Sequence, residues 1–187
     1  MASAAWKAMA GLMVAAVVDT AASAAAQVPA GAPAVEPVIT RVRARDDHLA
    51  RLILDAAKLS STFRNMVETI EVSHGIVYVE RGRCRHGARA CLEFLGYARP
   101  YRLLRIVLDD RKTDAELIGS LGHELQHVRE VLDDPTVTSA AALVLFYSWY
   151  AKRTGDVFET AEAINVGDAV RRELRNANRS QRHKTDR

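Results

Sequence analysis

Cysteine is scarce in this sequence, because its 187 residues include only Cys84 and Cys91. Their spacing fits no common zinc-binding pattern, which argues against a zinc site built from cysteines. In an oxidising compartment the two thiols are expected to form one disulfide that closes a small loop. A metal site made by Cys84, His86 and Cys91 is the alternative.

Long hydrophobic runs are also missing. The apolar stretches at residues 9–18 and 137–150 are both shorter than the roughly 20 residues that cross a bilayer. The first follows Lys7 and precedes small residues, which is the order of regions in a secretory signal peptide. Residues 1–26 are therefore predicted to be a signal peptide that directs the protein to the periplasm or the cell exterior. An uncleaved signal that anchors the chain to a membrane is the alternative.

Neither sign of charge dominates, since 26 Lys and Arg residues face 23 Asp and Glu residues, a formal net charge of +3. The basic excess gathers at the C-terminus, where residues 177–187 are predicted to be a disordered, solvated tail. Interleaved aromatic residues and a recognition motif are missing there, so no nucleic-acid partner is expected. Residues 27–40 are rich in Pro and Ala and are predicted to be a flexible leader. Residues 41–176 have the size of a single domain.

The motif that indicates a specific chemistry is His-Glu-x-x-His at positions 123–127, which is typical of zinc sites. Apolar residues recur at spacings of three and four from Leu117 to Leu132, which predicts an amphipathic helix around it. Residues four apart lie on the same face of a helix, so His123 and His127 can point two imidazoles at one metal ion. Glu124 can then reach the attacking water and act as a general base.

A catalytic zinc ion takes three protein ligands and leaves one position open for water, so two histidines are not enough. Residues 128–132 contain no glycine that could turn the chain back toward the metal. Glu130 lies roughly 10 Å along a straight helix from His123. It is therefore predicted either to orient an imidazole or to be exposed.

A carboxylate from a later segment is the better source of a third ligand. A helix is predicted over residues 158–176, with Ala163, Val166 and Val170 on its apolar face. Glu159 lies four residues before Ala163, so its carboxylate is expected to turn inward. Glu162 is rotated off that face.

This order of segments resembles the gluzincin branch of the zinc metallopeptidases, in which a His-Glu-x-x-His helix precedes a helix whose Glu completes the site. The resemblance covers residues 113–172. The pattern Glu-x-x-Ala-Asp of some of these families is similar to residues 159–163, although Glu162 replaces the Ala and Ala163 replaces the Asp. The resemblance implies a zincin-like fold, one zinc ion and Glu159 as the third ligand, with Glu162 in reserve.

The predicted fold class is α+β. Runs rich in β-branched and aromatic residues at 76–80, 92–95 and 101–108 are predicted to form an antiparallel sheet of about three strands. A helix over 43–59 precedes this sheet, and the His-Glu-x-x-His helix packs against it. Two further helices follow, the first of them a buried helix at about 139–150.

Tyr147 and Tyr150 lie on the helix between the two ligand-bearing segments, so either is a candidate donor to a developing oxyanion. Taken together, the predictions describe a secreted zinc-dependent metallopeptidase that acts on a peptide or protein substrate. A secreted, non-catalytic zincin-like domain that binds zinc or a partner is the alternative. Nothing in the sequence identifies the substrate or the oligomeric state.

Overall fold

The computed structural model describes residues 39–109, 111–154 and 157–185. The predicted signal peptide and residues 27–38 of the predicted leader lie outside this part of the chain. The elements follow in the order β1 (Val42–Ala44), α1 (Asp47–Leu59), α2 (Ser61–Glu71), β2 (Gly75–Gly82), the 3-10 turn η1 (Arg85–Gly87), β3 (Ala90–Ala98), β4 (Tyr101–Asp109), α3 (Asp114–Asp133), α4 (Ala140–Tyr150), β5 (Lys152–Thr154), β6 (Val157–Glu159) and α5 (Ala161–Thr185). The fold class is α+β, as predicted. None of the helices in the described part of the chain has the length and apolar character needed to cross a bilayer.

The main sheet has four strands in the order β1-β2-β4-β3. β3 and β4 are antiparallel neighbours, whereas β2 pairs in parallel with both β1 and β4. The prediction of an antiparallel sheet of three strands is therefore wrong. Consecutive strands were expected to be neighbours, but β4 inserts between β2 and β3, and its residues Leu104, Ile106 and Leu108 are fully buried, as suits a central strand. β3 is left at the edge of the sheet.

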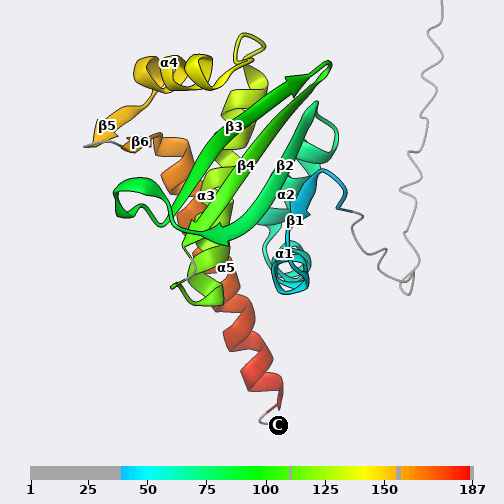
Figure 1. Cartoon of the computed structure of the whole chain (residues 1–187). Coiled ribbons are helices and arrows are strands. Elements are labelled where there is room, and N and C mark those ends of the chain that lie inside the picture. Colours follow the sequence, from blue (N-terminus) through cyan, green and yellow to red (C-terminus); the bar gives the residue numbers. More distant parts are fainter. Residues whose placement is uncertain (1–38, 110, 155–156, 186–187) are drawn as a thin grey trace, which may run out of the picture. The chain divides into compact units, whose positions relative to one another are not determined.

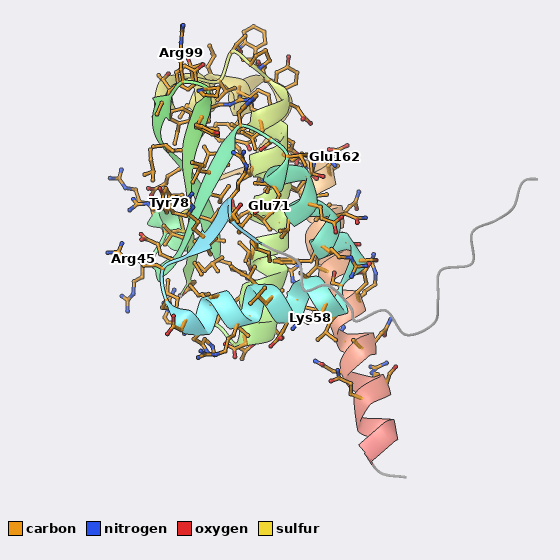
Figure 2. The ribbon with its side chains drawn as sticks, turned by 90° about the vertical axis from the view of Figure 1, so that its right-hand side faces the viewer. Arg45, Lys58, Glu71, Tyr78, Arg99 and Glu162 are labelled. Carbon is orange, nitrogen blue, oxygen red and sulfur yellow. A yellow bond between two sulfur atoms is a disulfide. The ribbon has the colours of Figure 1, made fainter. Side chains whose placement is uncertain are left out.

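α1, α2 and α3 lie on one face of this sheet (Figure 1). Val77 and Val79 of β2 and Leu125 of α3 are fully buried in the core between sheet and helices. The alternate residue Tyr78 and the nearby Arg45 extend from the opposite face of the sheet (Figure 2). The period of two along each strand thus separates an apolar face from a polar one.

Both ends of α3 are fixed by side chains. At its start the carboxylate of Glu116 accepts hydrogen bonds from the backbone N–H of Thr113 at 3.1 Å and from its hydroxyl at 2.9 Å, as part of a capping box. At its end the guanidinium of Arg102 donates to the carbonyl oxygens of Val131, Leu132 and Asp134 at 2.6–2.7 Å. A cation at this end also complements the helix dipole.

α3 and α5 cross at glycines. A Cβ atom at Gly122 would lie 2.9 Å from Cγ2 of Val170, and one at Gly167 would lie 3.1 Å from Cβ of His123 and 3.2 Å from the backbone oxygen of Gly119. Contacts this short leave no room for a larger residue without a shift. Gly167 weakens the helix locally, but it allows α5 to approach the face of α3 that carries the histidines.

The helix predicted over 158–176 differs from α5 at both ends. β5 and β6 form a hairpin that includes Phe158 and Glu159, and Thr160 then caps the helix by accepting a hydrogen bond from the N–H of Ala163 at 3.1 Å. At the other end α5 continues to Thr185, so the prediction of a disordered tail from residue 177 is wrong for the described part of that stretch. No Pro or Gly follows Gly167, and the helix therefore meets no breaker.

Two further expectations from the sequence are corrected. Residues 43 and 44, expected in the first helix, belong to β1, which pairs with β2. The helix expected to be buried, α4, buries only Leu143 and Tyr147, while Trp149 and Tyr150 are 77% and 72% exposed. An apolar sequence predicted burial on all sides, but a single face of α4 packs on the domain.

We expect replacement of Arg102 by Met to lower the free energy of unfolding by about 2–4 kcal/mol, because three carbonyl oxygens at the end of α3 lose their donor. Urea denaturation measures this change. Arg99→Met is the matched control, since Arg99 is exposed in the adjacent turn (Figure 2), and it should change stability by less than about 0.5 kcal/mol. Equal stability of the two variants would contradict a role for Arg102 in holding α3.

Candidate metal centre

Three potential ligands meet where α3 approaches the end of β6. His123 and His127 lie one turn apart on α3, with ring centroids 4.8 Å apart and ring planes at 83°. Nε2 of His123 is 3.0 Å from Oε2 of Glu159, the last residue of β6. The ligand atoms of the three residues all lie within 4.8 Å of one another. The structure thus brings the two histidines and Glu159 into one group that could hold a metal ion.

The contact between Glu159 and His123 is not an ordinary hydrogen bond. Oε2 of Glu159 is buried and has no hydrogen-bond partner among the described residues, although Nε2 of His123 is only 3.0 Å away. A buried carboxylate oxygen without a donor is costly. Two ligand atoms this close, with no hydrogen bond between them, fit a cation bound by both.

Glu130 fixes the orientation of His127. Oε2 of Glu130 lies 2.9 Å from Nδ1 of His127, and because a carboxylate can only accept, Nδ1 carries the proton and Nε2 is left as the metal-binding atom. Oε1 of Glu130 accepts hydrogen bonds from Gln126 at 3.1 Å and from the hydroxyl of Thr160 at 2.7 Å. Since Thr160 follows Glu159 directly, one carboxylate connects the histidine helix to the segment that carries the third ligand.

The charge of Glu130 is maintained by these donors. Burial on its own raises the pKa of a carboxyl group, but hydrogen bonds from His127, Thr160 and Gln126 outweigh it and leave the pKa of Glu130 below its ordinary value. Of the two alternatives predicted from the sequence, the structure therefore places Glu130 as the acceptor that orients an imidazole.

Glu124 is the most deeply buried acid of the site, with 6% of its surface exposed. Burial raises its pKa, while the neighbouring His127 and His123 act in the opposite direction without cancelling the rise. His123 shows the complementary effect: burial lowers its pKa, but the carboxylates of Glu159 and Glu124 raise it above its ordinary value.

These residues lie in a cleft of about 710 Å³. One wall is formed by the loop after β2 and the first residues of β3, including Ala90 and Leu92, and the opposite wall by Tyr147, Phe158 and Ile164. Figure 1 shows the loop and the β6–α5 junction on the same side of α3. The start of β3, an edge strand of the sheet, therefore lines the cleft together with the candidate ligands.

A disulfide between Cys84 and Cys91 closes this loop, as predicted. Both sulfur atoms are bound in it, so the alternative metal site of Cys84, His86 and Cys91 lacks its thiolate ligands. The disulfide instead fixes one wall of the cleft. Its position beside the metal centre could not be foreseen from the spacing of the two cysteines.

The remaining predicted site residues are not grouped with the ligands. Glu162 lies in the first turn of α5 and is exposed (Figure 2). Tyr147 lines the cleft, but its hydroxyl donates to the backbone oxygen of His127 at 3.1 Å. Burial raises the pKa of Tyr147 far above its ordinary value. Tyr150 is 72% exposed and is not among the residues that line the cleft.

Comparison of the chain with protein-family models, with curated proteins and with solved structures gives no match. What the site can do must therefore be inferred from its own residues and their geometry. That geometry consists of three converging ligands, a buried carboxyl group beside them and a cleft with a strand edge along one wall.

We expect Glu130→Gln to weaken binding of a divalent metal ion by about 10- to 100-fold, because the amide no longer holds the imidazole of His127 as a charged acceptor does. Competition against a chromogenic chelator measures the affinity. Asp133→Asn is the control, since it removes the same charge from an exposed position of α3. If both variants bind the metal as tightly as the wild type, Glu130 does not orient a ligand.

Proposed function

We propose that the protein is an exported zinc metallopeptidase, which hydrolyses peptide bonds in a chain bound along the edge of β3. The observation that carries this proposal is the convergence of His123, His127 and Glu159 within 4.8 Å. The buried carboxyl group of Glu124 lies in the same cleft. Order and spacing of these residues resemble those of the gluzincin metallopeptidases.

Zinc is the metal that suits the donor set best. Two imidazoles and one carboxylate are a common ligand set of catalytic zinc, which keeps a fourth position for water. Ligands at about 2.0–2.2 Å from a tetrahedral zinc ion are roughly 3.3–3.5 Å from one another. The distance of 3.0 Å between His123 and Glu159 is shorter than this value, and the ligand atoms of the whole group spread over up to 4.8 Å, so side-chain rotations would have to bring all three to one ion.

Glu124 is the proposed general base. When bound, zinc supplies a Lewis acid for the substrate carbonyl and lowers the pKa of water toward about 7. Glu124 accepts the proton of the attacking water on its carboxylate and passes it to the leaving amine.

The substrate is proposed to bind as an extended strand. Among the described strands β3 pairs with β4 alone, and its residues 90–93 line the cleft, so we infer that its unpaired edge offers backbone donors and acceptors there. A peptide that adds to this edge gains main-chain hydrogen bonds whatever its sequence. The strand at 76–80 belongs to β2, which is paired on both sides and has no free edge.

Export is supported by two independent features. Residues 1–26 have the regions of a signal peptide. The disulfide between Cys84 and Cys91 is of the kind that persists in oxidising compartments.

We expect Glu124→Gln to lower kcat/KM toward quenched fluorogenic peptides by about 10²- to 10⁴-fold, because the proton acceptor is lost. Its metal content should equal that of the wild type, since Glu124 is not a ligand. Glu162→Gln is the matched control, as it removes an exposed carboxylate near the same site, and it should retain full activity. Hydrolysis that survives in Glu124→Gln would exclude this mechanism and favour a non-catalytic zinc-binding domain.

A further inference from the structure

Three arginines lie in the walls of the cleft. Arg85 and Arg89 belong to the wall that is closed by the disulfide, and Arg171 belongs to α5 on the other side of the metal centre. None of them is needed for the proposed hydrolysis. Their common charge in a partly enclosed space requires an explanation.

Arg171 is held in place by its surroundings. Its side chain passes over Gly119, where a Cβ atom would lie 2.5 Å from Cγ and 2.6 Å from Nε of the arginine. Its Nη1 donates to Asp168 at 2.9 Å. Gly167 lies between Arg171 and His123. A Cβ atom at Gly167 would lie 3.5 Å from Nη1 of Arg171 and 3.1 Å from Cβ of His123. The guanidinium is therefore fixed beside the first histidine ligand.

Arg85 and Arg89 are exposed, and their side chains make no hydrogen bond or ion pair with another residue of the described chain. Arg85 begins the turn η1, which lies inside the disulfide loop. The loop backbone is tied to the sheet at Arg89, whose carbonyl oxygen accepts a hydrogen bond from the N–H of Asp109 at 2.9 Å. Both guanidiniums thus project from an anchored wall with donors available to a bound molecule.

The acids of the cleft do not neutralise these arginines. Among the described residues that line it, the carboxylates are those of Glu93, Glu124 and Glu159. Glu93 accepts hydrogen bonds from Nε and Nη2 of Arg105, and the other two belong to the metal centre. The acids that line the cleft therefore leave the charges of Arg85 and Arg89 uncompensated, whereas Arg171 is paired with Asp168 outside the lining.

We propose that the cleft selects substrates that carry a carboxylate near the bond to be cleaved, and that Arg85, Arg89 and Arg171 determine this specificity. This inference rests on the proposed function for its reaction, although it concerns the binding of the substrate. Guanidinium groups bind carboxylates through paired, charge-assisted hydrogen bonds. The carboxylate of the substrate can come from two sources, an acidic side chain or the free C-terminus of a peptide.

The test uses the zinc-loaded full-length protein and two sets of matched peptides. In one set Glu or Asp near the scissile bond is replaced by Gln or Asn, and in the other the C-terminal acid is replaced by a carboxamide. We expect the acidic member of at least one set to be preferred by roughly four- to twenty-five-fold in kcat/KM, the size expected when two exposed or half-exposed ion pairs of about two- to fivefold each act together. The set that shows the preference identifies the source of the carboxylate. Raising the salt concentration from about 50 mM to about 500 mM should reduce this preference.

The triple variant Arg85→Gln, Arg89→Gln, Arg171→Gln should reduce the preference to within about twofold. The double variant of Arg85 and Arg89 alters exposed loop positions alone, so it keeps the test valid if changes at Arg171 disturb the packing on Gly119. Arg83→Gln and Arg175→Gln are the controls, because both arginines are exposed and neither lines the cleft. They should retain the preference.

Binding is measured separately on Glu124→Gln by fluorescence anisotropy with the same peptides. If this protein binds the acidic peptides more tightly but the wild type cleaves none of them, the proposed function fails and the carboxylate specificity stands. If the wild type cleaves acidic and amide peptides equally well, the specificity is wrong and the peptidase stands. Equal binding of both members in both sets would overturn the inference without reference to catalysis.

Discussion

The interactions of the Glu130 carboxylate hold the candidate metal centre together. One of its oxygens orients His127, and the other accepts from Thr160, the residue after Glu159. The two segments are far apart in the sequence, and this side chain joins them at the point where ligands from both must meet. The hydrogen bonds keep Glu130 charged in spite of its burial, so the same contacts that align the imidazole also stabilise the acceptor.

The close crossing of α3 and α5 makes this junction possible. Gly122 and Gly167 allow the helices to approach within distances that a Cβ atom would block, and the start of α5 then lies beside His123. The end of α3 is held by Arg102, and its start by the capping box of Thr113. A helix fixed at both ends and packed at its centre provides a rigid frame for a site that needs sub-ångström placement.

Much of the site could be predicted from local pattern. The spacing of His123 and His127 defines a shared helix face. Glu159 was predicted to turn inward because it lies four residues before Ala163 on one helix face, but Glu159 ends β6 and is not helical, so it reaches the histidines for another reason. A three-residue strand carries too little periodicity to be predicted from the sequence. The sheet order also escaped prediction, since nothing local indicates that β4 inserts between β2 and β3. The approach of Arg171 to the cleft depends on the crossing of two helices, which no single segment encodes.

X-ray absorption at the zinc edge of the zinc-loaded protein, recorded beside Glu159→Gln, tests the metal centre most directly. We expect one zinc ion per chain with two imidazole nitrogens and one carboxylate oxygen at about 2.0–2.2 Å. In Glu159→Gln the carboxylate contribution should disappear and the affinity should fall. A zinc ion bound without imidazole ligands, or a spectrum that Glu159→Gln leaves unchanged, would contradict the assignment of His123, His127 and Glu159 as one site.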